Sequence, residues 1–301
     1  MVSSLIQRAF VKKGVTVDIL RLDKMHALAP GNKWFKLALN LSAAKAVGAE
    51  TLLSFGGAFS NHLHALAAIA QDQGLAAVAC VRADAGRDLS PTLQDAVAWG
   101  MHLHFLSRSD YRRRHEAGFV AELASQYKRP YLIPEGGANV LGAQGCRGIV
   151  ELIPRSGQDY HAVVLACGTG TTLAGVSAQI ADGVQLIGIP VLKAEAYMAA
   201  DIQRLQFALD HHRSNWSLDH RFHGGAYARL SAPLQEFMLD FEARYGIRLD
   251  PVYTAKMAYA VDCMINNGEF AEGARVLLIH SGGMQGRRGY PQLPEGVSRA
   301  T

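Results

Sequence analysis

The sequence predicts an α/β fold with two open, twisted parallel-sheet domains and helices on both faces of each sheet. Short β-branched or aliphatic runs alternate along the chain with longer helical patterns, which is typical of βαβ units. Runs such as AVVLA and VLLI are apolar on both faces, as expected for strands that helices cover on both sides.

Seven short runs are expected to be buried strands, and eight longer periodic segments lie between or after them. The predicted strands are Val15–Leu20, Thr51–Phe55, Ala76–Val81, His102–Leu106, Ala162–Ala166, Gln185–Ile189 and Arg275–Ile279. The predicted helices are Lys33–Val47, Asn61–Gln73, Leu89–Trp99, Tyr111–Tyr127, Thr172–Ile180, Ala194–Leu209, Pro233–Tyr245 and Lys256–Asn266. The basic run Arg112–His115 is expected to be a solvated helix face, and glycine-rich turns near Pro30–Gly31 and Gly136–Gly145 suggest domain junctions.

Composition excludes several classes of protein. The chain has 301 residues, of which 49% are hydrophobic and 19% charged, as in a globular protein with a core. Lys and Arg number 30 against 26 Asp and Glu, so no nucleic-acid or membrane partner is implied. No stretch approaches the roughly 20 apolar residues of a membrane span, and the N-terminus lacks a long apolar segment. We therefore expect a cytoplasmic protein.

The four cysteines, Cys80, Cys146, Cys167 and Cys263, are scattered without CxxC spacing. A disulfide framework needs dense, patterned cysteines in a short secreted chain, so these are expected to be reduced, buried thiols. No group of His, Cys, Asp and Glu has the spacing of a metal site, and none is predicted.

Glycine-bearing turns follow three of the predicted strands. In the first, SFGGAFSNH (54–62), Gly56 and Gly57 permit close backbone approach. Ser60 and Asn61 can cap the next helix while presenting polar groups at the carboxyl end of a strand, where open α/β sheets bind ligands. The alternative is a helix cap with no further role.

The second turn, CGTGTT (167–172), joins a buried strand to a helix. Successive backbone N–H groups and threonine hydroxyls there form an anion nest that suits a single phosphate. A Walker A loop is excluded because no Gly-Lys-Ser/Thr follows, and the third glycine of a dinucleotide fingerprint is absent. A plain tight turn remains the alternative.

The third turn, HSGGMQG (280–286), places the polar Ser281 at the end of a buried strand and indicates a ligand. His280 beside it is expected to be a hydrogen-bonded packing residue.

Two lysines, Lys33 and Lys36, begin a predicted helix in the segment PGNKWFK. Such a pair is usually a solvated face, but the Trp-Phe pair after Lys33 could desolvate its amine and lower its pKa. An amine of that kind together with a single-phosphate nest suggests a Schiff base to a phosphorylated aldehyde, pyridoxal 5'-phosphate (PLP).

Six motifs in order along the chain, GNKxxK, GGxxSNH, PEGGANxLGAQG, GTGTT, DPVYTAK and IHSGG, carry a resemblance to a known family. The chain resembles the PLP-dependent 1-aminocyclopropane-1-carboxylate (ACC) deaminase / D-cysteine desulfhydrase family, over about residues 21–286. This resemblance implies the tryptophan synthase β-like fold (fold type II), with PLP in a cleft between the two domains.

The resemblance also implies roles for individual residues. Lys33 matches the lysine that holds PLP covalently and moves the substrate proton, and Lys36 would be structural or a surface charge. Asn61 matches the side chain that hydrogen-bonds the ring hydroxyl of the cofactor, and Ser60, Asn61 and His62 match the loop that grips the substrate carboxylate. In ACC deaminases the matching serine also lies close to the reacting carbon.

The remaining matches are the phosphate loop Gly168, Thr169, Gly170, Thr171 and Thr172; the substrate-flanking Tyr227 and Tyr253, either of which could act as acid or base; and Ser281, at the position whose hydroxyl meets the pyridine nitrogen.

Two departures from ACC deaminases favour a different reaction. The glutamate that follows DPVY in those enzymes is Thr254 here, and a hydroxyl there favours a weaker electron sink, adequate for β-elimination of thiolate. The glutamine after Ser-Asn is His62, as in the desulfhydrase branch. In addition, Phe35 and Phe59 replace the usual arginine and glutamine and add two aromatic residues near the pocket.

The sequence and the resemblance together predict a large PLP-binding domain, residues 1–36 plus 139–301, and a small domain, residues 37–138, in a homodimer. The predicted activity is D-cysteine desulfhydrase, a lyase reaction giving a 2-oxo acid, ammonia and sulfide. The alternatives are ACC deamination to 2-oxobutanoate, another small-amino-acid lyase or a racemase, and a non-catalytic PLP- or amino-acid-binding protein.

Overall fold

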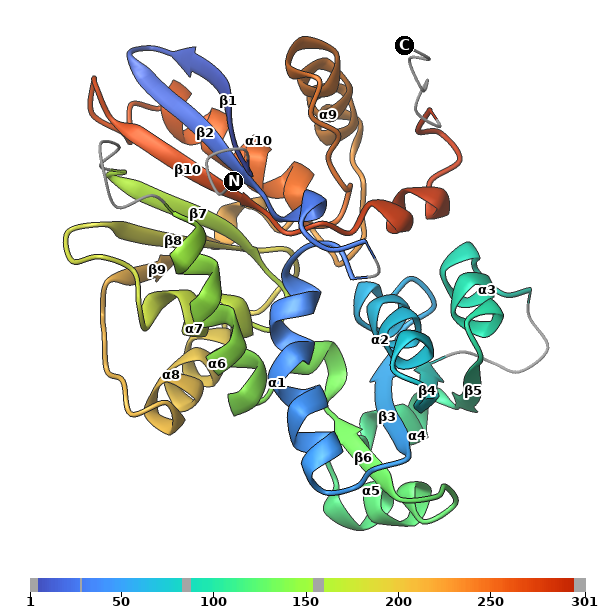
Figure 1. Cartoon of the computed structure of the whole chain (residues 1–301). Coiled ribbons are helices and arrows are strands. Elements are labelled where there is room, and N and C mark those ends of the chain that lie inside the picture. Colours follow the sequence, from blue (N-terminus) through green and yellow to red (C-terminus); the bar gives the residue numbers. More distant parts are fainter. Residues whose placement is uncertain (1–4, 28, 83–87, 154–159, 295–301) are drawn as a thin grey trace. The chain divides into compact units, whose positions relative to one another are not determined.

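The computed structural model describes residues 5–27, 29–82, 88–153 and 160–294 (Figure 1). The chain forms two compact units. Unit 1 takes the chain up to Leu41 and Gly137–Gly282, and unit 2 takes Ser42–Gly136 and the chain from Gly283 onward.

The unit boundaries differ from the predicted domain limits in one main respect. The segment after Gly282, which the sequence assigns to the large domain, belongs to unit 2. The physical reason is an ion pair between Arg288, in the short 3-10 helix η6 (Met284–Gly289), and Asp95 in α3 (Pro91–Ala98). The Asp95 carboxylate also bonds His64 Nε2 at 2.9 Å, so this segment is tied to two helices of unit 2.

Unit 1 is built on a six-stranded sheet with the order β1-β2-β10-β7-β8-β9. Its strands are β1 (Ile6–Lys12), β2 (Val15–Arg21), β7 (Ala162–Cys167), β8 (Gln185–Pro190), β9 (Trp216–Leu218) and β10 (Arg275–His280). All neighbouring pairs are parallel except β1 and β2. The predicted parallel arrangement is therefore confirmed for the four predicted strands of this sheet, and β9, which the sequence did not predict, pairs in parallel with β8. β1 was not predicted, and it forms a hairpin with β2 because Lys13 and Gly14 both have positive φ, 48° and 75°, as a two-residue hairpin turn requires.

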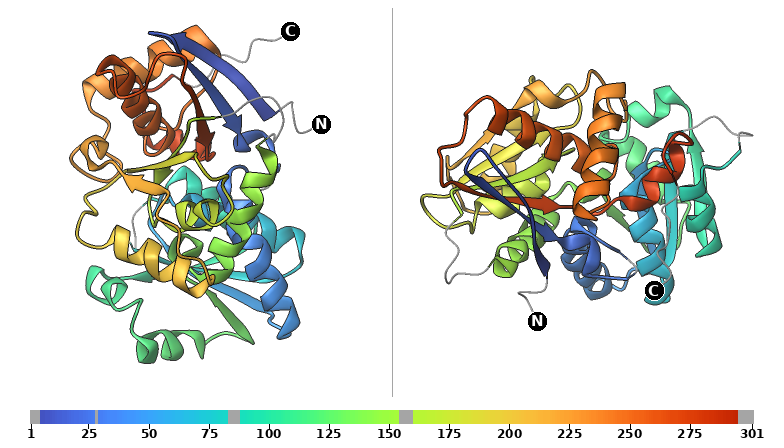
Figure 2. Two further views of the ribbon diagram at one scale, coloured as in Figure 1. Left: turned by 90° about the vertical axis from the view of Figure 1, so that its left-hand side faces the viewer. Right: turned by 90° about the horizontal axis from the view of Figure 1, so that it is seen from above.

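Helices cover both faces of this sheet, as predicted (Figures 1 and 2). The helices of unit 1 are α6 (Val140–Cys146), α7 (Thr171–Ser177), α8 (Met198–Ala208), α9 (Ala232–Tyr245), α10 (Thr254–Asn266) and the first part of α1 (Asn32–Ala46). Val163, Leu165 and Leu277 pack in one core cluster with residues of α6, α7 and α8. The alternate residues Val164 and Leu278 are equally buried, because α10 contacts the same strands.

Unit 2 contains a four-stranded, fully parallel sheet with the order β5-β4-β3-β6. Its strands are β3 (Thr51–Gly56), β4 (Ala76–Arg82), β5 (Met101–Leu106) and β6 (Pro130–Ile133), and its other helices are α2 (Asn61–Asp72), α4 (Arg108–Arg112) and α5 (Ala117–Ala124). Leu53, Phe55 and Val78 form a core with residues of α4 and α5, while α2 and α3 also pack on the strands. The short strand β6 was not predicted.

The single helix predicted over Tyr111–Tyr127 is wrong: the chain forms α4 and α5 with a turn between them. The backbone N–H groups of Arg113 and Glu116 donate to carbonyl oxygens three residues earlier in the chain, at 2.9 and 2.8 Å. These i→i+3 hydrogen bonds replace the i→i+4 bonds of an α-helix and interrupt it. Most of the basic run lies in this turn, so it is no helix face. A second difference is α6, which forms inside the glycine-rich stretch expected to be a junction, capped by the Asn139 side chain.

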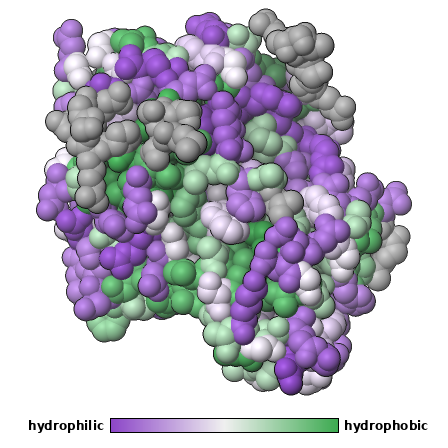
Figure 3. Space-filling model, in the orientation of Figure 1, coloured by the Kyte–Doolittle hydropathy of each residue, from purple (hydrophilic) through white to green (hydrophobic). Residues whose placement is uncertain are grey.

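No helix among the residues described is long and apolar enough to cross a membrane. On the face shown in Figure 3, hydrophobic and polar residues are interspersed. The four cysteines are free thiols, three of them buried and Cys263 partly exposed, which confirms the prediction except for the burial of Cys263.

Helix α7 packs unusually closely on α6, because Gly175 has no side chain. A Cβ at Gly175 would lie 2.1 Å from the carbonyl oxygen of Ala143, far inside van der Waals contact. We expect Gly175→Ala to lower the free energy of unfolding by about 1–3 kcal/mol through overpacking, measured as a lower thermal midpoint.

Gly118 offers a matched control, since it is also helical but exposed. A Cβ there meets nothing within 4 Å, so Gly118→Ala is expected to raise stability by up to about 1 kcal/mol. Equal effects of the two substitutions would contradict the close-packing explanation.

Candidate active site

The first turn of α1, which carries Lys33, lies against the main chain that follows β10. Gly31 has a φ of 88°, and a Cβ on it would lie 1.9 Å from the carbonyl oxygen of Ser281. The N–H of Asn32 donates to the same oxygen at 3.2 Å. The motifs GNKxxK and IHSGG, about 250 residues apart in the chain, therefore meet at the carboxyl end of β10.

Lys33 has the lowered pKa that the sequence predicts. Burial and the nearby positive charge of Lys36 lower the pKa of Lys33 from 10.5 to about 7, with Cys146 and Asp250 acting in the opposite direction. Its Nζ bonds Asn32 Oδ1 at 2.8 Å, and Asn32 Nδ2 in turn donates to Thr172 Oγ1 at 2.9 Å. The aromatic residues after Lys33 point elsewhere, since Trp34 stacks on His26 with ring centroids 4.1 Å apart.

The predicted phosphate loop connects β7 to α7. Gly170 has a φ of 71° and precedes the first residue of the helix, and Thr169 Oγ1 lies 2.8 Å from Thr171 Oγ1. Backbone N–H groups at this turn, without side chains at positions 168 and 170, can bind an anion.

Lys36 is not the surface charge considered from the sequence. Its side chain is buried, and its Nζ donates to Thr169 Oγ1 at 3.3 Å. Burial lowers its pKa, with the thiols of Cys146 and Cys167 opposing. A buried amine beside the loop strengthens the attraction of that loop for a phosphate.

The two predicted tyrosines form a pair in unit 1. Their hydroxyl oxygens are 3.1 Å apart, and the Lys33 Nζ lies 6.0 Å from the centre of the Tyr253 ring. The Tyr253 ring also packs on the phosphate loop, since a Cβ at Gly168 would lie 3.2 Å from its Cε1. Tyr227 is half-exposed and Tyr253 only partly so, so both remain reachable from solvent.

Asp250 is a residue of this cluster that the sequence analysis missed. It is buried, and its carboxylate accepts the N–H groups of Val252, at 3.0 Å, and Tyr253, at 2.6 Å. Burial raises the pKa of Asp250 to about 6, although these N–H bonds and Lys33 act to lower it. The only signal in the sequence was its place at the start of DPVYTAK.

Thr254 is buried at the start of α10, and its hydroxyl is used locally. Its Oγ1 accepts the N–H of Asp250 at 2.7 Å and donates to the Asp250 carbonyl at 3.4 Å. This hydroxyl therefore stabilises the turn that presents Tyr253.

Ser281 is partly exposed directly after β10, while His280 before it is a packing residue, as predicted. His280 is fully buried, with Nε2 at 2.8 Å from the Arg248 carbonyl and Nδ1 at 3.3 Å from Asp23. These contacts fix the strand end from which Ser281 projects.

The predicted SNH loop lies in unit 2. Ser60 caps α2 by accepting the N–H of Leu63 at 3.2 Å, and Asn61 Oδ1 accepts a hydrogen bond from Gln285 Nε2. His62 is buried, and its Nε2 lies 2.9 Å from Ser54 Oγ. Because Ser54 gives its one proton to the Ile133 carbonyl, at 2.7 Å, His62 Nε2 donates in this contact.

The structure thus groups Lys33, Thr169–Thr172, the tyrosine pair and Ser281 within unit 1, and Ser60, Asn61 and His62 within unit 2. The two substituted aromatics differ in environment. Phe35 is partly buried and packs against the core cluster of unit 1, where a Cβ at Gly148 would lie 3.6 Å from its ring. Phe59 is exposed and packs on Gly289 in unit 2.

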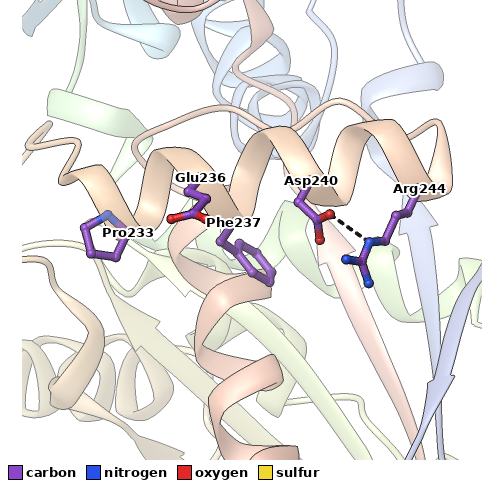
Figure 4. Close-up of a pocket in the computed structure, with 5 residues that line it drawn as sticks. All are labelled: Pro233, Glu236, Phe237, Asp240 and Arg244. Atoms are coloured by element: carbon purple, nitrogen blue, oxygen red, sulfur yellow. Dashed lines mark hydrogen bonds and ion pairs between the residues drawn. The ribbon is translucent and has the colours of Figure 1, made fainter.

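A pocket elsewhere on unit 1 is lined by one face of α9 alone: Pro233, Glu236, Phe237, Asp240 and Arg244 (Figure 4). Asp240 and Arg244 bond one another at 2.7 Å. The lining contains none of the clustered motif residues. Among the residues that the structure describes, no group of three or more His, Cys, Asp or Glu side chains is arranged to hold a metal ion.

Comparison with known proteins matches residues 13–282 to the family model described as "Pyridoxal-phosphate dependent enzyme". A Thermotoga maritima protein named "Putative 1-aminocyclopropane-1-carboxylate deaminase" is 31% identical, covering 93% of each chain. The Arabidopsis thaliana "Bifunctional D-cysteine desulfhydrase/1-aminocyclopropane-1-carboxylate deaminase, mitochondrial" is 29% identical over 91% of this chain and 73% of its own. A crystal structure of an ACC deaminase homologue, 27% identical, superposes with a TM-score of 0.81 over 92% of this chain and 87% of that one.

The lowered pKa of Lys33 can be measured directly. Because only a neutral amine is nucleophilic, acylation of Lys33 in the cofactor-free protein is expected to accelerate from about pH 6 to about pH 8 and then level off, whereas an ordinary lysine accelerates to about pH 10. Mass spectrometry of the Lys33 peptide reports the rate.

The same titration of Lys33 in the variant Lys36→Met tests the contribution of the neighbouring charge. Removing the neighbouring positive charge is expected to raise the apparent pKa of Lys33. A Lys33 that titrates near its ordinary value in the unmodified protein would contradict the burial described above.

Proposed function

The chain belongs to the family of pyridoxal-phosphate dependent enzymes, and we propose from this premise that it deaminates a small amino acid, with D-cysteine as the preferred substrate. Its fold is the tryptophan synthase β-like fold of that family. The proposed reaction is α,β-elimination, in which D-cysteine and water give pyruvate, ammonia and hydrogen sulfide. The observation that carries the proposal is the Lys33 amine, with its lowered pKa of about 7, near a loop suited to one phosphate.

The residues of unit 1 fit the cofactor. A Lys33 pKa of about 7 leaves a large fraction of neutral amine near neutral pH, which attachment to an aldehyde requires. We assign the phosphate to Gly168, Thr169, Gly170, Thr171 and Thr172, with Lys36 as a further hydrogen-bond donor beside the loop at Thr169. Ser281 is assigned to the pyridine nitrogen. From the resemblance alone, Asn61 of unit 2 is assigned to the ring hydroxyl. Bound PLP supplies an electron sink for negative charge at the substrate α-carbon.

Lys33 is the proposed base at the α-carbon. Its amine can take the α-proton because a pKa of about 7 leaves a substantial neutral fraction near pH 7, and Asn32 holds its Nζ by a hydrogen bond. The Asn32 contact to Thr172 links the position of this base to the phosphate loop.

Tyr253 and Tyr227 are the proposed acid and base at the departing group. One phenol donates a proton to the sulfur that leaves the β-carbon, and the second phenol, 3.1 Å away, can replace that proton by hydrogen-bond transfer. Ser60, Asn61 and His62 are assigned to the substrate carboxylate. The bonded Ser54–His62 pair supports this assignment by holding the start of α2 in place.

Elimination from D-cysteine is preferred to ACC ring opening because of Thr254. In the resembling ACC deaminases this position carries a glutamate that faces the pyridine nitrogen, whereas the Thr254 hydroxyl is engaged by the main chain of Asp250. Opening an unactivated cyclopropane demands a stronger electron sink than expulsion of thiolate. ACC deamination to 2-oxobutanoate and ammonia stays the second candidate, because the similar proteins carry that name.

The choice of substrate is tested on purified holoenzyme with D-cysteine, L-cysteine and ACC side by side. We expect sulfide, ammonia and 2-oxo acid from D-cysteine, with kcat/KM at least about tenfold above that for ACC. Faster ammonia release from ACC than from D-cysteine would overturn the preference, and no product from any amino acid would overturn the proposed function.

Lys33→Ala is expected to abolish both turnover and the visible absorbance of the lysine-linked cofactor, because no other amine stands at this position. The surface substitution Lys45→Ala is the control and should retain both. Turnover or lysine-linked absorbance that survives in Lys33→Ala would argue against the role of Lys33.

Tyr253→Phe and Tyr227→Phe separate the two phenols. Replacing the tyrosine that transfers the proton is expected to lower kcat by roughly 10²–10⁴-fold. The corresponding limb of the pH–rate profile should be lost as well. Steady-state kinetics across pH measure this. Full activity of both variants would remove the tyrosine pair from the mechanism.

The homodimer, the domain limits and the position of PLP between the domains stay predictions from the sequence and the resemblance, and the cytoplasmic location stays a prediction from composition. Sedimentation of the holoenzyme measures the first of these.

A further inference from the structure

Lys256 is a buried amine in unit 1 that the proposed chemistry does not use. It lies in the first turn of α10, is 1% exposed, and donates to three main-chain carbonyls. These are the oxygens of Val191 at 2.9 Å, His223 at 2.7 Å and Ala226 at 3.1 Å.

The number of donors matches the number of acceptors. An ammonium group has three N–H donors, and each of them meets one carbonyl here. Methionine has the length to fill the space but no donor, so it would leave three carbonyl groups without this partner. Burial lowers the pKa of Lys256 to about 8, with the Asp250 carboxylate opposing, so the amine is still mainly charged at neutral pH.

Two of the three carbonyls belong to the loop His223–Ala226, which lies on the surface. Its glycines adopt left-handed backbone conformations, with φ of 71° at Gly224 and 87° at Gly225. The loop approaches the lysine closely, since a Cβ at Gly224 would lie 3.2 Å from Lys256 Cε. Lys256 thus anchors an exposed, glycine-containing loop to a buried helix.

Tyr227 is the residue that directly follows this loop, and Tyr253 lies one helical turn before Lys256. We propose that Lys256 is a positioning residue, which holds the loop His223–Ala226 against α10 and so keeps the Tyr227 hydroxyl beside the Tyr253 hydroxyl. This inference rests on the proposed function only in that the tyrosine pair faces the substrate.

The order of the loop is tested first, without substrate. Arg229 is exposed just beyond the loop and offers a trypsin site. In holoenzyme carrying Lys256→Met, cleavage after Arg229 is expected to be at least about tenfold faster than in the unmodified holoenzyme.

Val261→Ala is the matched control, because Val261 is buried in the same helix, and the substitution removes packing without touching the loop. It is expected to lower the thermal midpoint but leave cleavage after Arg229 nearly unchanged. Cleavage of Lys256→Met at the unmodified rate, or equal acceleration in Val261→Ala, would overturn the proposal.

Kinetics then test whether Lys256 acts through Tyr227. In the background of Tyr227→Phe, Lys256→Met is expected to lower kcat by less than about twofold further, because the hydroxyl it positions is already absent. A loss of several-fold that is the same with and without the Tyr227 hydroxyl would overturn the link to Tyr227.

If Lys256→Met does not fold, Gly224→Ala disturbs the same contact from the loop side. Its Cβ meets Lys256 and the backbone there has positive φ, so faster cleavage after Arg229 is expected again, and an unchanged rate overturns the proposal. Faster cleavage in the variant, together with no turnover of D-cysteine or ACC by the unmodified holoenzyme, would leave the positioning role standing and overturn the proposed function alone.

Discussion

The close approach of the first turn of α1 to the main chain after β10 is the contact on which the site depends. Gly31 meets the Ser281 carbonyl where no side chain fits, and Asn32 donates to the same oxygen. This contact fixes the position of the helix start that carries Lys33. The hydrogen bond between Asn32 and Thr172 connects the same helix start to the loop after β7. The ends of two parallel strands and one helix start are therefore held together mainly by main-chain geometry.

Two buried amines, of Lys36 and Lys256, and the partly buried amine of Lys33 share one electrostatic feature within unit 1. Lys33, Lys36 and Lys256 bond neutral partners: an amide oxygen, a threonine hydroxyl and main-chain carbonyls. Neutral oxygens satisfy the donors but compensate less for lost hydration than a carboxylate would, so burial lowers each pKa. In Lys33 the lowered pKa provides a nucleophile and base. In Lys256 the hydrogen bonds to neutral carbonyls hold a loop in place.

The carboxylate of Asp250 stabilises the turn before α10. It accepts main-chain N–H groups of the residues that lead into α10, and Thr254 closes the same turn. The motif DPVYTAK thus forms one hydrogen-bonded turn that leads into α10 and carries both Tyr253 and Lys256.

The sequence by itself determined the alternation of strands and helices and the glycine turns at strand ends, because these depend on local pattern. It also predicted a lowered pKa for Lys33, but attributed it to Trp34 and Phe35, whereas burial and the charge of Lys36 lower it in the structure. It did not predict β1, whose strand character comes from pairing with β2, or the break between α4 and α5, where i→i+3 bonds replace the α-helical path. Only the tertiary structure decided that Lys36 is buried at Thr169, that Phe35 packs against the core cluster, and that Lys256 meets three carbonyls. The burial and partners of these side chains are set by segments far away in the chain, so no local pattern could contain them.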